Sequence, residues 1–260
     1  TYHWRHHFDD TSAYFAGYLT FLDKLMGTAV SLKGKTVAVT GASGTLGRAL
    51  LQELARQKAR PVALTTSNDA TFAEGIACWQ WQPGSETDLQ EALKKVDILI
   101  LNHGLNVHGD RTPEAVHTSL EVNALSGWRL MEVFFSTVET SPQRATKEVW
   151  VNTSEAEVNP AFSPLYEVSK RLLGDLVSLR RPDAPCVVRK VILGPFKSDL
   201  NPIGVMSAGW VAWAVVALAK RNVRNIIVTI NPLTYLFFPA KELSQGIYFR
   251  LFTHKKSIKE

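Results

Sequence analysis

The chain has 260 residues, which is long enough for one large α/β domain with a complete hydrophobic core. Its apolar content of 45% and charged content of 20% are ordinary for a soluble globular protein. The net charge of +5 comes from scattered basic residues, and the one small cluster, Lys255, Lys256 and Lys259, is too weak to indicate nucleic-acid binding. We therefore expect no nucleic-acid partner.

The cysteines and the start of the chain bear on its compartment. Cys78 and Cys186 lie far apart and form neither a metal-ligand nor a disulfide pattern, which favours a reducing compartment. No signal peptide is recognisable, and the start at Thr1 rather than Met suggests a piece of something longer. We expect a cytoplasmic protein, or one on the cytoplasmic face of a membrane in its full-length form.

Residues 1–34 differ in character from the rest of the chain. They are rich in aromatic residues and histidine, then apolar, and they end at Gly34. Asp10 and Thr11 are candidate caps for a helix that would run to about Leu25. We interpret residues 1–34 as an appendage and residues 35–260 as the main domain.

From Lys35 onward, predicted strands and helices alternate. Strands are expected at 36–40, 61–65, 77–81, 96–101, 147–153, 186–193 and 225–230. After the helix that follows the first strand, helices are expected at 87–95, 113–138, 164–179 and 208–221. This order predicts an α/β protein with a Rossmann-type doubly wound parallel sheet of about seven strands and helices on both faces.

A glycine-rich turn follows the first predicted strand. Gly41, Gly44 and Gly47 stand at G-x-x-G-x-x-G spacing, and leucines at helical spacing come after them. In such units the first glycine allows the turn, the second admits a pyrophosphate and the third lets helix pack on strand. The free N–H groups at the helix start would hold the phosphates, so the pattern favours dinucleotide binding over a plain turn.

A tyrosine and a lysine lie four residues apart on a later predicted helix. Tyr166 and Lys170 would share one helix face, and an ammonium beside a phenol lowers the phenol pKa. A general acid/base acting on an alcohol or carbonyl needs such a pKa. Ser154 ends the preceding strand, where its hydroxyl would reach the reacting oxygen. The alternative is a surface pair on an amphipathic helix.

Two apolar stretches raise the question of membrane contact. Residues 205–219 carry no charge but are too short to span a bilayer, so a helix buried against the sheet or a partner subunit is favoured. Residues 232–240 are broken by prolines and also cannot span. They are candidates to cover a substrate pocket or to touch a bilayer surface.

Together these residues resemble the short-chain dehydrogenase/reductase family. The resemblance implies Asn123, Ser154, Tyr166 and Lys170 as catalytic residues: Tyr166 as proton donor, Lys170 lowering its pKa and holding the ribose, Ser154 polarising the carbonyl, and Asn123 ordering a water. The motifs that carry it are TGASGTLG (40–47), LNHG (101–104), EVNALSG (121–127), NTS (152–154), YEVSK (166–170) and LGPFKS (193–198).

The resemblance also implies the residues around a nicotinamide cofactor. The chain departs from the usual family pattern at some positions. Its glycine spacing is that of extended or atypical members, His103 stands where a small residue is usual, and Gly194-Pro195 reverses the usual Pro-Gly order. The expected cofactor-binding residues are Gly41, Ser43, Gly44, Thr45, Leu46, Gly47, Thr66, Ser67, Asn102, His103, Gly104, Tyr166, Lys170, Pro195 and Ser198. The carboxamide group of the nicotinamide is expected near Ile192 and Ser198.

The end of the second predicted strand bears on the choice of cofactor. An acidic residue there would bind the ribose hydroxyl of NAD and repel a 2′-phosphate. This chain has hydroxyl groups at Thr65 to Ser67 and no carboxylate until Asp69. We therefore expect NADP, with NAD as the alternative and with Arg48 or Ser67 as phosphate contacts.

The front of the chain contains an H-x-x-H-H pattern at His3, His6 and His7. Histidines at this spacing can ligate a transition metal. The stretch resembles the tail of a sterol desaturase/fatty acid hydroxylase domain, and the whole chain resembles cyanobacterial bifunctional sterol desaturase/short-chain dehydrogenase proteins. Such di-iron enzymes need several histidine boxes and this chain has one, so we expect no metal.

The sequence thus predicts an NADP-dependent oxidoreductase that transfers hydride between nicotinamide and an alcohol or carbonyl. Aromatic residues after Pro202, such as Trp210 and Phe237, suggest an apolar, lipid-like or sterol-like substrate. The alternatives are an NADP-binding regulatory module without turnover, and an epimerase or dehydratase of extended type that shows no net oxidation. A homo-oligomer is expected from the resemblance, and contact with a membrane surface is a further expectation for a longer protein.

Overall fold

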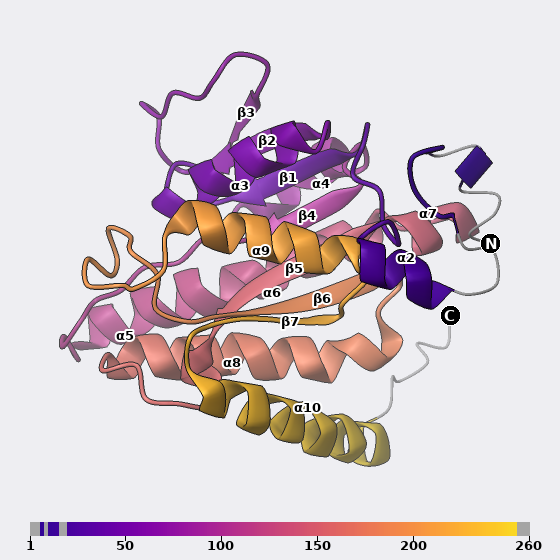
Figure 1. The fold of residues 1–260 in the computed structure, drawn as a ribbon. Helices are drawn as coiled ribbons and strands as arrows, with labels where there is room; N and C mark the ends of the chain where they lie inside the picture. The colour runs from indigo at the N-terminus through magenta and orange to yellow at the C-terminus, as the bar shows by residue number, and fades with distance from the viewer. Residues whose placement is uncertain (1–5, 8–9, 16–19, 254–260) are drawn as a thin grey trace, which may run out of the picture.

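The computed structural model describes residues 6–7, 10–15 and 20–253, and it contains one seven-stranded parallel sheet (Figure 1). The strand order is β3-β2-β1-β4-β5-β6-β7. The predicted doubly wound α/β fold is confirmed. The strands are β1 (Thr36–Thr40), β2 (Arg60–Thr65), β3 (Ala77–Gln80), β4 (Ile98–Leu101), β5 (Glu148–Ser154), β6 (Val187–Leu193) and β7 (Asn225–Val228).

Helices cover both faces of the sheet. Helices α3 and α9 pack together on one face, and α5, α6 and α8 lie on the other, with α10 outside α8 (Figure 1). Side chains of β5 alternate between the two cores: Trp150 lies in the core with α3 and α9, and Val149 in the core with α6 and α8. The helices are α2 (Thr20–Met26), α3 (Thr45–Arg56), α4 (Gln90–Leu93), α5 (Pro113–Leu120), α6 (Ser126–Ser136), α7 (Ser141–Thr146), α8 (Pro164–Arg180), α9 (Ala208–Lys220) and α10 (Pro232–Phe252).

The long helix predicted at 113–138 is interrupted in its middle. Between α5 and α6 the turn η2 (Glu121–Leu125) is a π-helix. The helix expected at 87–95 is likewise split into a 3₁₀ turn, η1 (Glu86–Leu89), and α4. Such turns change the direction of side chains, and π turns are frequent at functional sites. The amphipathic pattern alone does not reveal them.

The prediction that a helix starts at Asp10 or Thr11 and runs to about Leu25 is wrong for its first part. The described residues 10–15 form turns and bends, and Tyr14 has a positive φ of 59°, which a right-handed helix excludes. Part of the appendage packs beside the end of α9, where the Val30 amide donates to the Lys220 carbonyl. The assignment of residues 1–34 as a separate region remains a prediction.

The reading of residues 232–240 as a proline-broken segment is wrong. Helix α10 runs from Pro232 to Phe252 through Pro239. Pro232 stands at the first helical turn, where a missing N–H costs nothing, and Asn231 caps the helix by accepting from the Leu233 amide. Across the ranges that the structure describes, no helix is both long and apolar enough for a membrane span.

Candidate active site

A cavity of about 510 Å³ lies at the carboxyl ends of the strands, where the glycine turn after β1 faces the loop after β4. Ten predicted cofactor-binding residues line it: Gly41, Ser43, Gly44, Thr45, Leu46, Thr66, Asn102, His103, Gly104 and Ser198. Eight lining residues were missed by the prediction: Trp81, Gln82, Pro83, Leu105, Val122, Phe196, Asp199 and Leu200. Trp81 directly follows β3, so its position after a strand was the available signal.

Two of the three glycines are required by the geometry of the turn. Gly41 has φ +59°, and a Cβ there would lie 2.8 Å from the His103 Cα. A Cβ on Gly47 would lie 2.2 Å from the Gly41 carbonyl oxygen, which is closer than real contacts allow. Gly44 is the N-cap of α3 and leaves the helix without a side-chain cap. The first N–H groups of α3 therefore remain available to an anion in the cavity.

His103 is fixed by hydrogen bonds on both ring nitrogens. Its Nδ1 lies 2.7 Å from Thr40 Oγ1, and its Nε2 lies 2.7 Å from Ser126 Oγ. Ser126 Oγ also donates to the Val122 carbonyl, so it can accept from Nε2–H of the ring. Burial and the positive charge of Lys170 lower the pKa of His103 to about 3. The histidine thus anchors the loop after β4 while one side of it lines the cavity.

Asn123 lies in the π turn and holds the same loop. Its Oδ1 accepts from the Leu105 amide at 2.7 Å, and its Nδ2 donates to the Leu105 carbonyl at 3.0 Å and to Ser169 Oγ at 3.0 Å. A Cβ on Gly104 would lie 2.9 Å from Asn123 Oδ1. The side chain of Asn123 therefore joins the loop after β4 to helix α8.

Ser154, Tyr166 and Lys170 gather beside this loop. Ser154 is the last residue of β5 and hydrogen-bonds the Tyr166 side chain. Lys170 Nζ lies 5.9 Å from the centroid of the Tyr166 ring and 3.5 Å from the Asn152 carbonyl oxygen. It is also close to the loop after β4, since a Cβ on Gly104 would lie 3.3 Å from it. The structure brings the predicted phenol, hydroxyl and amine together.

The charge states of these groups differ from the expectation. Burial raises the pKa of Tyr166, and the hydrogen bond from Ser154 only partly opposes this effect. Lys170 is itself buried, which lowers its pKa to about 8 despite the negative charge of Glu157. The expected lowering of the Tyr166 pKa by Lys170 is therefore not a feature of this arrangement, because desolvation is the larger effect.

Five predicted cofactor residues do not line the cavity: Gly47, Ser67, Tyr166, Lys170 and Pro195. Gly47 is buried behind the turn, and the Pro195 carbonyl accepts from the Val205 and Met206 amides instead. Tyr166 and Lys170 stand beside the loop rather than in the lining. Of the histidine pattern, His3 lies outside the described residues, and His6 bonds the Ala13 carbonyl through Nδ1 at 2.8 Å. The part of the chain that the structure describes contains no group of three or more potential metal ligands.

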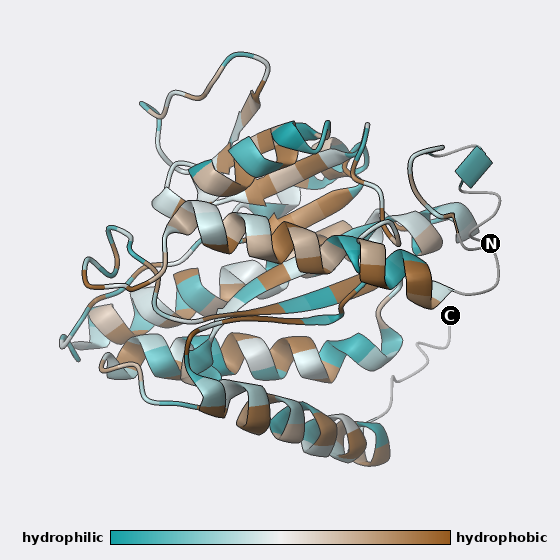
Figure 2. Cartoon of the chain, in the orientation of Figure 1, coloured by the Kyte–Doolittle hydropathy of each residue, from teal (hydrophilic) through white to brown (hydrophobic). Residues whose placement is uncertain are grey.

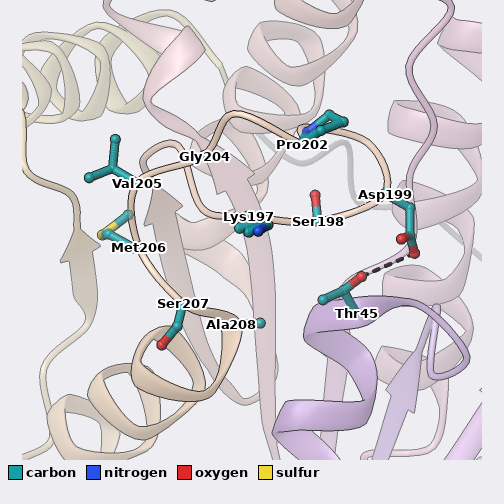
Figure 3. Close-up of a pocket in the computed structure, with 10 residues that line it drawn as sticks. All are labelled: Thr45, Lys197, Ser198, Asp199, Pro202, Gly204, Val205, Met206, Ser207 and Ala208. Carbon is teal, nitrogen blue, oxygen red and sulfur yellow. Dashed lines mark hydrogen bonds between the residues drawn. The ribbon is translucent and has the colours of Figure 1, made fainter.

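A second cavity of about 570 Å³ lies beside the segment that follows β6 (Figure 3). It is enclosed by the segment 197–208, which connects β6 to α9, and by Thr45 at the start of α3. Thr45 Oγ1 donates to Asp199 Oδ2 at 3.1 Å, which ties this segment to the glycine turn. Thr45, Ser198 and Asp199 line both cavities, so the two form neighbouring parts of one region.

Known structures resemble the chain in fold. It is similar to a short chain dehydrogenase from Burkholderia cenocepacia in complex with NADP, with a TM-score of 0.68 and 20% identity over 86% of this chain and 100% of that one. The chain has the fold of the short-chain dehydrogenases. The chain is also similar to ligand-free aldohexose dehydrogenase from Thermoplasma acidophilum, with a TM-score of 0.65 and 16% sequence identity. That match covers 87% of this chain and 98% of the other. An alcohol dehydrogenase from Thermococcus sibiricus, complexed with 5-hydroxy-NADP, matches with a TM-score of 0.64 and 19% sequence identity. That match covers 76% of this chain and 96% of the other.

At the level of sequence, no protein-family model matches the chain. The chain is 58% identical over 261 residues to a Synechocystis protein named monoglucosyldiacylglycerol epimerase. The match covers 98% of this chain and 64% of that protein, so the chain spans less than two thirds of its relative. The short-chain dehydrogenase resemblance inferred from the motifs agrees with the observed fold.

Proposed function

We propose that this chain is a short-chain dehydrogenase-type enzyme that binds NADP and acts on a secondary alcohol or its ketone. The observation that carries the proposal is the meeting of Ser154, Tyr166 and Lys170 beside the loop after β4, which faces the glycine turn at the carboxyl edge of the sheet. Ligands of open α/β sheets bind at this edge. NADP, when bound, supplies the acceptor and donor of hydride.

The residues of the cavity suit a dinucleotide. The uncapped start of α3 offers N–H groups to phosphate, and Gly44 leaves room for it. Two of the similar structures were solved with NADP or 5-hydroxy-NADP, which supports this cofactor. Arg48 favours NADP over NAD, because its exposed guanidinium is held near the end of β2 by the Ser43 and Thr71 carbonyls, both at 2.9 Å.

The site residues take roles that follow from their chemistry. Tyr166 exchanges a proton with the reacting oxygen, and Ser154 holds that oxygen by a hydrogen bond. Lys170 supplies positive charge beside the phenol and stabilises its ionised form when that form arises. Asn123 positions the loop after β4 through its two bonds to Leu105.

Within this class we favour an epimerase that acts on the sugar headgroup of a glycolipid. The relative with 58% identity is named for epimerisation of monoglucosyldiacylglycerol, and the glycine spacing is that of extended members. In such a reaction a sugar hydroxyl would lose its proton to the ionised form of Tyr166 and later regain it. The hydrogen of the C–H bond would leave as hydride to the bound NADP from one face of the carbon and return to the other face. Reactant and product have the same oxidation state, so no net oxidation is observed.

The test is incubation of the purified chain with NADP and monoglucosyldiacylglycerol, followed by NMR of the sugar. We expect a changed configuration at one carbon, and Tyr166→Phe should lower the rate by about 10²–10⁴-fold while cofactor binding is kept. Glu91→Gln, at an exposed residue of α4 that lines neither cavity, is the control and should keep full activity. Full activity of Tyr166→Phe would overturn the mechanism. Tight cofactor binding without turnover of the glycolipid or of simple ketones would favour the regulatory module.

A further inference from the structure

Helix α10 has its charged side chains on the inner side. Thr234 and Phe238 are fully buried against the domain, and Lys241, Glu242 and Gln245 face the same way. Gln245 donates to Asp175 Oδ1 at 2.8 Å on α8. In an ordinary surface helix the inner face would be the apolar one.

The charges on the inner side are fully paired. Glu242 contacts Lys190 at 2.6 Å and Arg181 at 3.1 Å, and Lys241 contacts Glu157 at 2.9 Å and Asp175 at 2.8 Å. Lys190 also contacts Glu157 at 2.8 Å, and both side chains are 0% exposed. Three basic and three acidic groups thus form a neutral cluster, which fixes α10 to α8 and β6.

The outer side of α10 is mostly apolar. Leu236, Leu243 and Leu251 are 65%, 68% and 72% exposed, and brown segments recur along this outer helix between teal and pale ones in Figure 2. Within Pro232–Phe252, all of which the structure describes, Arg250 is the single exposed charged residue. The other large apolar residues exposed on this helix are Leu233, Tyr235, Phe237, Ile247, Tyr248 and Phe252. A stripe of this size needs an apolar partner.

The position of α10 relates this stripe to the active site. The helix starts directly after β7, and Glu155, the neighbour of Ser154, accepts from Thr229 and Thr234 at 2.6 and 3.3 Å. The start of the helix is therefore tied to the strand end that carries the site. Arg250 and the sequence that follows, with Lys255, Lys256 and Lys259, add positive charge beyond the stripe.

We propose that the outer face of α10 lies on a lipid bilayer that contains anionic lipids. Aliphatic and aromatic side chains enter the interface, and the basic residues meet lipid headgroups. This docking would bring the carboxyl edge of the sheet to the membrane surface, where a glycolipid headgroup is presented. The choice of a bilayer over a second copy of the chain rests on the glycolipid substrate of the proposed function and on the basic residues.

The test is co-sedimentation with phosphatidylcholine vesicles that contain about 30% phosphatidylglycerol, compared with pure phosphatidylcholine. We expect the parent chain to bind, and to bind more tightly with phosphatidylglycerol. Leu243→Ser/Ile247→Ser/Leu251→Ser should weaken binding by more than about 100-fold, because each exposed side chain contributes by its burial in the interface. Its circular dichroism should match that of the parent, since all three residues are exposed.

The matched control is Trp210→Ser/Trp213→Ser, which removes exposed apolar residues from α9 on the opposite face of the sheet and should bind as the parent does. Equal binding by the triple variant would overturn the proposal. The proposal would also be overturned if the parent chain did not bind vesicles but formed dimers, and the triple variant were monomeric. Vesicle binding is measured without turnover, so binding without epimerisation overturns only the proposed function. Turnover of a short-chain soluble glycolipid without vesicle binding overturns only the docking.

Discussion

The residue that most constrains the site loop is His103. It bridges Thr40 on β1 and Ser126 on α6, and its ring meets Trp81 edge to face at 5.1 Å. A small residue at this place would leave both hydroxyl partners to find other bonds in a buried setting. The departure from the family pattern is thus accommodated by a specific network of hydrogen bonds.

The buried neutral state of His103 predicts a pH dependence of stability. Its folded pKa of about 3 lies below the ordinary 6.5, so the unfolded chain binds the additional proton. The stabilisation is therefore complete above pH 6.5 and is lost as the pH falls from 6.5 toward 3. Urea unfolding at stepwise pH from 7.5 to about 5 should show a declining free energy of unfolding in the parent. His103→Gln should flatten this slope, and an unchanged slope would contradict the assignment.

At the scale of elements, two glycines of the turn have different roles: Gly47 matters for stability and Gly44 for cofactor binding. Gly47→Ala would place a methyl group 2.2 Å from the Gly41 oxygen, so the free energy of unfolding should fall by about 1–3 kcal/mol. Gly44→Ala meets only ordinary contact at 3.4 Å and an ordinary φ of −73°, so stability should change little. Its methyl group enters the phosphate space, and NADPH affinity should fall. Urea unfolding and NADPH fluorescence titration measure the two effects, and a stable Gly47→Ala would contradict this account.

The attachment of α10 gives a second prediction at this scale. Glu242→Gln removes the carboxylate that pairs with Lys190 and Arg181. Lys190 retains Glu157, so the expected loss is about 1–3 kcal/mol, below the 3–5 kcal/mol for a buried charge left with no partner. Glu91→Gln, in the exposed pair with Lys94, is the control and should leave the unfolding midpoint unchanged. Equal effects of the two changes would show that the cluster does not hold the helix.

For the whole molecule, cofactor binding is linked to stability. A ligand that binds only the folded chain stabilises it by about 2.7 kcal/mol at a hundred times its Kd. Thermal unfolding should therefore shift upward with NADPH, and less with NADH at the same concentration. Arg48→Ala should bring the two shifts together if this guanidinium meets the 2′-phosphate. A larger shift with NADH in the parent would contradict the preference for NADP.

The whole molecule combines a sheet that carries the candidate active site with a helix, α10, that has two different faces. The sheet, α3 and α8 create a site at the carboxyl edge, and α10 adds a neutral inner face and an apolar outer face to the same body. The inner face is fixed by the paired cluster together with the buried Phe238. The outer face thereby remains free for an external partner.

The sequence by itself determined the features that depend on neighbours along the chain. The apolar run at 36–40, the spacing of Gly41, Gly44 and Gly47, and the separation of Tyr166 from Lys170 are local patterns, because strand and helix periodicity and turn geometry act over a few residues. Alternating elements then leave few topologies for a parallel sheet. The fold followed from these patterns, whereas the ten correctly expected residues of the cavity lining came from the family resemblance.

The tertiary structure decided what depends on contacts between distant residues. Packing and paired charges carry α10 through Pro239, against the local preference of proline. The raised pKa of Tyr166 comes from burial, and Asn123 in the π turn bonds to Leu105 and Ser169, contacts that no local pattern encodes. Lys190, Glu157 and Glu242 are far apart in sequence, and only the folded chain joins them into one cluster.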